Sequence, residues 1–302
     1  MKYIFGPVNS RRFGISLGID LSPEVKSCNF DCLYCELERA KPVPRMRNEA
    51  DTKEIIAEVK EYIRKNGYPD VITVTANGEP TLYPKLDALI DRLNYLKGNS
   101  KTLILSNGST IKDKKMQEIL SKFDIVKISL DAVDQKTFEK INRVLKGIYV
   151  KDIIEGLKEF RKIFKGELIV EILLVRYIND SIDNILKTAE ILKDIKPDRV
   201  DLGTVDRPPA YRVYPLSDEE LFNIARFFDG LNINVISRGK DSIEEKISLS
   251  EEQIIKTIKR RPYTYQDIQN IFDDKTVQKV QKLIKEGILK ETRTQKEIFI
   301  TT

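Results

Sequence analysis

The sequence predicts an α/β protein whose main part is a parallel sheet, followed by a small helical domain. Apolar stretches of strand length alternate with amphipathic stretches of helical period, and six strand–helix units follow one another in this way. Strands in such a series pair in parallel through right-handed crossovers. Past a polar, charged segment the pattern changes to three short helices and a hairpin. We therefore predict a main domain at 1–238, a linker at 239–248 and a small domain at 249–302.

The strands and helices of the main domain are predicted in order from periodicity and capping residues. A Gly/Pro/Ser/Arg segment at 5–12 precedes a first strand at 13–20, in which apolar residues alternate. Asp51 or Thr52 caps a helix that runs to about residue 65. Further strands are predicted at 71–75, 102–105, 125–130, 168–175, 199–204 and 233–236, and further helices at 86–96, 113–123, 135–164, 182–192 and 217–230.

The last fifty residues are typical of a winged helix, which is a variant of the helix-turn-helix. A capping box at 250–253 begins its first helix. Two more helices are predicted at 264–271 and 275–286, and a hairpin is predicted from 288–290 and 297–300.

One face of the predicted third helix is basic. Its buried stripe consists of Val277, Val280, Leu283 and Ile284, which leaves Lys275, Lys279, Lys282 and Lys285 toward solvent. Such a face suits nucleic-acid phosphates. A solvated Lys-rich helix and a module that docks on protein are the alternatives.

Composition limits the class of protein. Charged residues make up 33% of the chain, which contains no His and no Trp, and this composition favours a surface with many ion pairs. A net charge of +5 permits an anionic partner without requiring one. We expect no transmembrane helix, because no run of 18 apolar residues occurs, and no leader segment. Clustered, odd-numbered cysteines argue for a reducing compartment, so a cytoplasmic location is predicted.

All the cysteines of the chain lie within eight residues, at Cys28, Cys32 and Cys35. This CxxxCxxC spacing lets three thiols close on one metal centre. Structural zinc fits poorly, because it takes four N or S ligands and the chain offers no fourth Cys and no His. Three thiolates on a [4Fe-4S] cluster would leave one iron open to another ligand. A zinc knuckle and an inert electron-transfer cluster remain as alternatives.

The motif resembles that of the radical S-adenosylmethionine enzymes, in which an aromatic residue precedes the last cysteine, as Tyr34 does here. The resemblance implies that S-adenosylmethionine chelates the open iron and is reductively cleaved to methionine and a 5'-deoxyadenosyl radical, which abstracts hydrogen from a substrate. It also implies an electron donor such as ferredoxin or flavodoxin. The implied architecture is a partial (βα)6 TIM-like barrel, with cluster and substrate at the carboxyl ends of the strands.

The segment after the second predicted strand is similar to the Gly-Gly-Glu segment of this family, which holds the amino group of S-adenosylmethionine. Here it reads Asn77, Gly78 and Glu79, so Asn77 stands where the first Gly is usual. Glycine lets a backbone approach a ligand closely. A simple strand-ending turn is the alternative.

Polar residues after the later strands are similar to family positions that contact the ribose and carboxylate of S-adenosylmethionine. The candidates are Asn107, Ser129 and Asp131. Arg176, in a loop found in several branches of the family, is a candidate for a bidentate carboxylate clamp. Strand-end turns and helix caps are the alternative for all of these.

The loop after the sixth strand suits a phosphate or a stacked base, because it carries Arg207, Tyr211 and Arg212. The N-terminal pair Arg11 and Arg12 is expected close by. We predict these five as substrate contacts. The alternative is a surface loop with solvated arginines.

Several segments together look like a subgroup near the wyosine-base tRNA synthases. They are Gly6-Pro7-Val8, Ser10-Arg11-Arg12, Ser16-Leu17-Gly18, the cysteine motif and Arg207-Pro208-Pro209. Those synthases carry a second cysteine triplet that this chain lacks. The first hypothesis for the substrate is therefore an RNA, such as a tRNA base, by neighbourhood only. Modification or activation of a protein or peptide is the runner-up, and a non-enzymatic iron–sulfur regulator that binds DNA is a third alternative.

Overall fold

The structure is a computed structural model, which describes residues 1–10, 13–236, 246–260, 262–294 and 297–302. The predicted substrate contacts Arg11 and Arg12 lie outside these ranges, as does most of the predicted linker.

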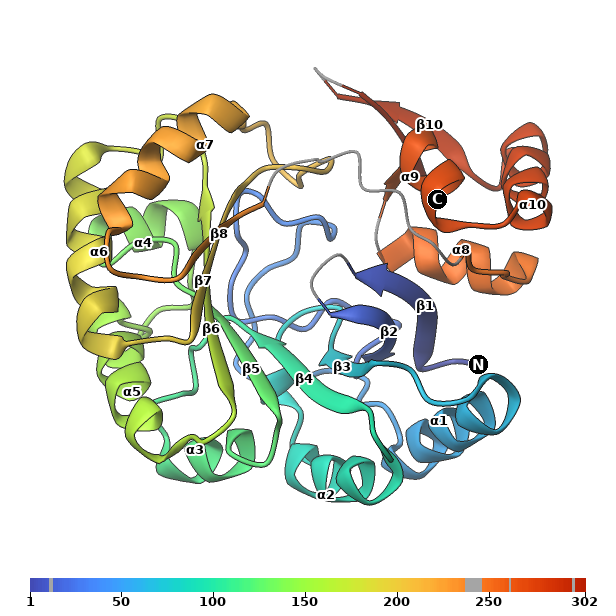
Figure 1. Ribbon diagram of the computed structural model, residues 1–302, viewed down its shortest axis with the longest axis horizontal. Coiled ribbons are helices and arrows are strands. Elements are labelled where there is room, and N and C mark those ends of the chain that lie inside the picture. The colour runs from blue at the N-terminus through green and yellow to red at the C-terminus, as the bar shows by residue number, and fades with distance from the viewer. Residues whose placement is uncertain (11–12, 237–245, 261, 295–296) are drawn as a thin grey trace.

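The main part is one sheet of eight strands in chain order, curved into an open, partial barrel (Figure 1). Within this sheet β1 and β2 pair antiparallel, and β2 to β8 pair in parallel. The predicted α/β fold with a parallel sheet is thus confirmed. The strands are β1 (Ile4–Ser10), β2 (Gly14–Asp20), β3 (Val71–Thr75), β4 (Lys101–Ser106), β5 (Ile125–Ser129), β6 (Glu167–Leu174), β7 (Arg199–Thr204) and β8 (Ile233–Val235).

Helices cover the outside of this sheet (Figure 1). Asp51 accepts the backbone N–H groups of Lys53 and Glu54, which satisfies the first turn of the first helix as the sequence predicts. The helices are α1 (Thr52–Asn66), α2 (Leu86–Leu96), α3 (Lys114–Leu120), α4 (Gln135–Asn142), α5 (Val150–Ile163), α6 (Ile182–Ile195) and α7 (Asp218–Ala225), with single 3-10 turns at Pro80–Leu82 and Arg226–Phe228.

Two elements differ from the prediction. The strand at 14–20 is the second one, because the preceding Gly/Pro segment forms β1 as the antiparallel edge of the sheet. An edge strand tolerates Pro7, which lies where the register with β2 shifts between Phe5 and Val8. The predicted helix over 135–164 is two helices, because Arg143 adopts a left-handed conformation (φ 48°) and ends α4.

Apolar residues close one end of the barrel. Phe13 packs against a buried cluster of Val71, Leu103, Ile125 and Ile169, each from a different strand. The loops that carry the predicted site residues lie at the opposite end, where the parallel strands finish.

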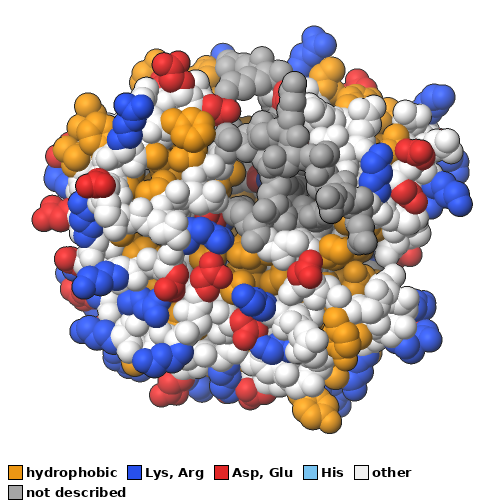
Figure 2. Space-filling model, viewed as in Figure 1, with side chains coloured by type: hydrophobic (Ala, Val, Ile, Leu, Met, Phe, Trp, Pro, Cys, Tyr) orange, Lys and Arg blue, Asp and Glu red, His pale blue; other side chains and the backbone are white. Residues whose placement is uncertain are grey.

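The surface agrees with the predicted abundance of ion pairs. Figure 2 shows acidic and basic side chains interspersed over the visible face. Lys122 on the outside of the barrel, for example, lies 2.6 Å from Asp87 and 2.7 Å from Asp91. In the parts of the chain that the structure describes, no helix is long and apolar enough to cross a membrane.

The C-terminal unit, residues 246–302, has its own apolar core around Phe272, Leu283 and Ile300. It lies beside β1, against which its first helix packs (Figure 1). The predicted helices and hairpin are present, and a short third strand adds to the hairpin in the order β10-β11-β9. Its elements are α8 (Glu251–Arg260), β9 (Tyr263–Thr264), α9 (Tyr265–Ile271), α10 (Asp274–Lys285), β10 (Lys290–Arg293) and β11 (Ile298–Thr301).

The predicted basic face of α10 is partly occupied within its own unit. Lys279 is half-buried and donates to the backbone oxygen of Leu249 at 2.7 Å, while Lys282 pairs with Glu251 at 2.9 Å. Lys275 and Lys285 remain exposed.

Candidate cofactor and substrate site

The cysteine loop, residues 28–35, is anchored on the end of α4. The backbone N–H groups of Asp31 and Leu33 donate to the oxygens of Asn142 and Ile141 at 3.0 and 2.9 Å. These oxygens belong to the last helical turn, whose carbonyls have no partner within the helix. Phe30 is buried edge-on against Phe138 of α4, with ring centroids 5.5 Å apart. These contacts hold the irregular cysteine loop in place on the end of α4.

A nitrogen donor lies within hydrogen-bonding reach of each cysteine sulfur. The donors are amide or ammonium groups from three different loops or helices. The pairs are Asn107 Nδ2 with Cys28 Sγ at 3.8 Å, Asn142 Nδ2 with Cys32 Sγ at 3.5 Å, and Lys26 Nζ with Cys35 Sγ at 3.4 Å. Such donors stabilise thiolates and, where thiolates bind iron, tune the reduction potential of the cluster.

Two of these thiols, those of Cys28 and Cys32, are poor thiolates on their own. Burial, with the charge of Glu79 adding to it, raises the pKa of Cys28 to about 12. Burial and the neighbouring cysteines raise the pKa of Cys32 as well. A bound cation reverses this preference, because a coordinated thiol loses its proton. Three thiols with N–H donors therefore match the donor set of an iron–sulfur cluster. Over the described ranges, no three Cys, Asp or Glu side chains are arranged to hold a single metal ion.

The predicted cosubstrate segment, residues 77–79, which we call the cosubstrate segment, runs directly alongside the residue that precedes the cysteine loop. Ser27 donates its N–H to Asn77 at 2.8 Å, and Glu79 donates its N–H to Ser27 at 2.9 Å. Gly78, at φ +141°, lies between these two hydrogen bonds. A Cβ at this position would lie 1.9 Å from the Ser27 oxygen, so any larger residue would clash. Only glycine permits this approach. The cosubstrate segment and the start of the cysteine loop therefore lie side by side.

The Glu79 carboxylate organises the loops around it. It is 2% exposed and accepts hydrogen bonds from the Thr81 N–H and hydroxyl, from Ser106 Oγ at 2.8 Å and from the Asn107 N–H at 2.7 Å. Burial raises the pKa of Glu79, and these donors oppose that rise. Both carboxylate oxygens are thus engaged by the protein, and a direct contact of this side chain with a cosubstrate stays a prediction.

Asp131 joins the cysteine loop to the end of β5. Its side chain accepts from Tyr34 Oη at 2.6 Å, from Asn142 Nδ2 at 2.9 Å and from the N–H of Leu173 at 2.9 Å. Burial raises the pKa of Asp131 to about 6, against the effect of these donors. Two residues that the sequence proposes separately, Tyr34 and Asp131, are therefore direct partners.

The remaining predicted cofactor residues are Asn107, Ser129 and Arg176. Asn107 lies beside the cysteine loop, where its amide also donates to Asn29 Oδ1 at 2.8 Å. Ser129 is half-buried at the end of β5. Arg176 does make the bidentate pair expected of it, but with Glu220 of α7 at 2.8 and 2.5 Å. Its proposed contact with a cosubstrate carboxylate stays untested.

The loop after β7, residues 205–216, lies along the cysteine loop. Ala210 donates its N–H to the Cys35 oxygen at 2.7 Å, Arg207 Nη1 pairs with Glu36 at 2.6 Å, and Tyr211 Oη donates to Asp31 Oδ2 at 2.5 Å. Arg212 is exposed, 6.0 Å from the ring of Tyr214. The structure thus brings Arg207 and Tyr211 to the predicted site, as the sequence analysis expects for this loop.

Two residues that the sequence analysis missed complete this surface. The guanidinium of Arg39 lies 4.2 Å from the centroid of the Tyr211 ring, and that of Arg143 lies 4.6 Å from it. Both side chains are exposed, although Arg143 Nε lies 3.2 Å from Asp31 Oδ2 and Arg39 Nε donates to the Ala210 oxygen at 2.5 Å. Arg39 belongs to the stretch after the last cysteine and Arg143 to the break after α4, so only the fold reveals the cluster.

A buried ion network inside the barrel was also missed. Lys127 of β5 is 4% exposed and lies 2.5 Å from Glu171 of β6 and 3.0 Å from Asp201 of β7. Arg199 adds a contact of 3.0 Å to Asp201. A lysine in the centre of an apolar strand is the sequence signal that indicates such a network, because an unpaired buried charge is too costly.

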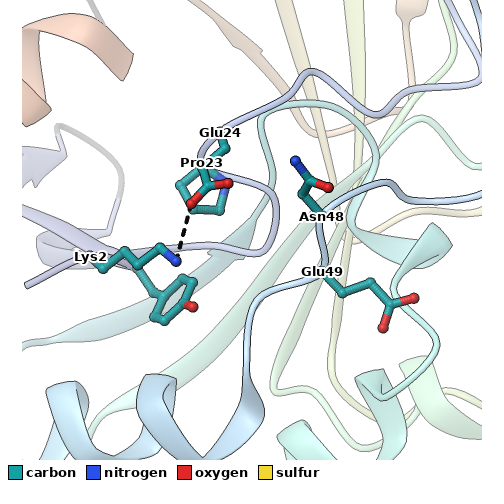
Figure 3. A pocket seen from close by; sticks show the side chains of 6 residues that line it. Lys2, Pro23, Glu24, Asn48 and Glu49 are labelled. Carbon is teal, nitrogen blue, oxygen red and sulfur yellow. Dashed lines mark ion pairs between the residues drawn. The ribbon is translucent and has the colours of Figure 1, made fainter.

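A cavity of about 240 Å³ lies near the N-terminus and contains none of the predicted site residues (Figure 3). Lys2 and Glu24, which pair at 3.1 Å, lie on one side of it, and Asn48 and Glu49 lie on the other (Figure 3). Its lining is Lys2, Tyr3, Pro23, Glu24, Asn48 and Glu49.

Comparisons with known proteins agree with this geometry. The family model described as "Radical SAM superfamily" matches residues 25–203. A protein of Helicobacter pylori (strain J99) named UPF0026 protein is 42% identical over 289 residues, which is 94% of this chain and 92% of that protein.

Two solved structures show a similar fold at low sequence identity. Streptococcus suis SuiB bound to S-adenosylmethionine has a TM-score of 0.58 and 20% identity over 73% of this chain, which spans half of the SuiB chain. TYW1 with a lysine-pyruvate adduct has a TM-score of 0.53 and 22% identity over 72% of this chain and 74% of its own.

Proposed function

Because the chain belongs to the radical S-adenosylmethionine superfamily, we propose that Cys28, Cys32 and Cys35 hold its [4Fe-4S] cluster. The family uses this cluster and S-adenosylmethionine, and the chain is accordingly an enzyme. With one electron from an external donor, the cluster would cleave S-adenosylmethionine to methionine and a 5'-deoxyadenosyl radical, which would take a hydrogen atom from a substrate. The observation that carries the residue assignment is the N–H donor beside each of the three sulfurs.

The cosubstrate is proposed to lie between the cysteine loop and the carboxyl ends of β3 to β5. Gly78 lets the cosubstrate segment lie directly against Ser27, the residue before the cysteine loop, because a Cβ there would meet the Ser27 oxygen at 1.9 Å. The half-buried Ser129 offers a hydroxyl group of the kind that pairs with a ribose or carboxylate, whereas the Asn107 amide already contacts Cys28, Asn29 and the Ser109 N–H. Glu79 and Asp131 act through their neighbours, because their carboxylates are occupied by protein donors.

For the substrate we propose an RNA. The argument rests on the exposed guanidinium groups of Arg39 and Arg143, which both lie against Tyr211, in a loop that contacts the Cys35 oxygen. Guanidinium groups bind phosphates, and planar groups of this kind stack with unpaired bases. The C-terminal unit is proposed to be a winged helix, whose exposed Lys275 and Lys285 could add phosphate contacts.

A protein or peptide substrate is the second candidate. It is favoured by the occupied state of the basic face on α10, where Lys279 and Lys282 contact their own unit. The reaction of the wyosine synthases is not proposed in the same form, because this chain carries no second cysteine triplet.

RNA binding can be tested by fluorescence anisotropy with labelled tRNA at several salt concentrations. The double variant Arg39→Ala/Arg143→Ala is expected to bind about tenfold more weakly, with a salt dependence reduced by roughly two phosphate contacts. Arg64→Ala, which removes an exposed ion pair with Glu61 on α1, is the matched control. Equal affinity of the double variant and the control would reject this surface and favour a screen of peptides for hydrogen transfer.

A further inference from the structure

We propose that the C-terminal unit contributes to the cosubstrate site through Arg260. This residue positions the cosubstrate segment by acting through Asp20. This inference rests on the proposed function of residues 77–79.

Asp20, the last residue of β2, is the centre of this connection. Its side chain is 1% exposed. Oδ1 accepts the N–H groups of Ser22 and Asn77, both at 2.8 Å. Oδ2 lies 2.5 Å from Nε of Arg260, at the end of α8. The same carboxylate therefore holds the first residue of the cosubstrate segment on one oxygen and the C-terminal unit on the other.

From Asn77 the chain of contacts continues to the cysteine loop. The Asn77 oxygen accepts from the Ser27 N–H at 2.8 Å and from Ser22 Oγ at 3.2 Å. Ser27 is followed directly by Cys28. A shift of Asp20 would therefore move the N–H that it holds and, with it, the strand-like pairing of Gly78 with Ser27.

The packing of α8 on β1 fixes the position of Arg260 relative to Asp20. Thr257 of α8 is 1% exposed and accepts the Gly6 N–H of β1 at 3.3 Å. The Arg260 side chain is 15% exposed and so is largely enclosed between the two units. A buried carboxylate requires a charged or hydrogen-bonded partner, and removal of that partner leaves the charge uncompensated. The position of α8 on β1 thus decides whether Asp20 is neutralised.

An ion pair that only holds the two units together would not affect binding of the cosubstrate. A double-mutant cycle distinguishes this structural role from the positioning role proposed here. The variants are Arg260→Gln, Asp20→Asn and their combination, with Lys282→Ala as the control that removes an exposed ion pair in the same unit. Each protein is reconstituted with iron and sulfide without oxygen. Iron content, melting temperature, the Kd for S-adenosylmethionine by calorimetry and the EPR spectrum of the reduced cluster with and without S-adenosylmethionine are then measured.

We expect Arg260→Gln to keep its iron content and to bind S-adenosylmethionine about tenfold more weakly. We also expect Arg260→Gln to have no further effect in the Asp20→Asn background, and Lys282→Ala to behave as wild type. A lowered melting temperature with an unchanged Kd, or additive effects of the two substitutions on the Kd, would overturn the inference. Wild-type protein that forms its cluster but binds no S-adenosylmethionine would overturn the proposed function instead, and the inference with it.

Discussion

The hydroxyl of Tyr34 lies 2.6 Å from Oδ2 of Asp131, and the same oxygen accepts from Asn142 at 2.9 Å. Asn142 in turn reaches Cys32 Sγ at 3.5 Å. One buried carboxylate therefore fixes both the aromatic residue of the cysteine motif and a donor to one of its sulfurs. The orientation of the loop depends on this network as much as on the cysteines.

Asn142→Ala is expected to make the reduction potential of the cluster more negative. The amide of Asn142 is a hydrogen-bond donor to Cys32, and loss of such a donor disfavours the extra electron on the cluster. A potentiometric titration followed by EPR measures the shift, with iron content as the check on assembly. Asn94→Ala, whose side chain contacts Lys122 on the outside of the barrel, is the control. A potential equal to that of wild type would contradict this role.

Gly78→Ala is expected to abolish binding of S-adenosylmethionine. A Cβ at this position would lie 1.9 Å from the Ser27 oxygen, whereas Gly67, also at positive φ, has nothing within 4 Å. Gly67→Ala should therefore cost only the backbone strain of about 1–3 kcal/mol. Calorimetric binding and urea unfolding of the two variants make the comparison. Retained binding in Gly78→Ala would show that the segment does not contact the cosubstrate as proposed.

Lys127→Met is expected to lower the free energy of unfolding by about 3–5 kcal/mol, because Glu171 and Asp201 would lose their shared cation inside the barrel. Lys158→Met removes an exposed pair with Asp194 and should cost at most about 1 kcal/mol. Urea unfolding of both variants decides the matter. Similar losses would mean that the buried network is no more important than a surface pair.

Arg260→Gln should destabilise the fold more at alkaline than at acidic pH. Burial raises the pKa of Asp20, and the charge of Arg260, with a smaller contribution from Lys259, opposes that rise. Without Arg260 the folded-state pKa of Asp20 rises further above its unfolded value. The stability that protonation supplies is then present at low pH and is lost as the pH rises through the folded-state pKa. We expect a deficit of about 3–5 kcal/mol at alkaline pH that shrinks as the pH falls. A deficit that is constant with pH would refute this explanation.

Local sequence patterns predict the strand–helix series well, because each element carries its own period and caps. Asp51 and Ser217 begin helices as predicted, and Ser217 forms a full capping box with Glu220. The edge strand β1 was not predicted, because its Gly and Pro residues obscure the alternation and its pairing with β2 supplies the order.

The structure places several of the predicted site residues near one another, whereas their partners were not predicted from the sequence. Asn107, Gly78 and Tyr34 do lie around the cysteine loop. The partners of Glu79, the stacking of Arg39 on Tyr211 and the pairing of Arg260 with Asp20 join segments that are far apart in the chain. Periodicity within a window carries no information about such contacts.

The measurement that tests the central claim most directly is anaerobic turnover. The protein is reconstituted with iron and sulfide, supplied with dithionite and S-adenosylmethionine, and assayed for 5'-deoxyadenosine and methionine by mass spectrometry. We predict both products from the wild-type protein and neither from Cys28→Ala, Cys32→Ala or Cys35→Ala. A cluster that assembles on the three cysteines while S-adenosylmethionine remains intact would contradict the account.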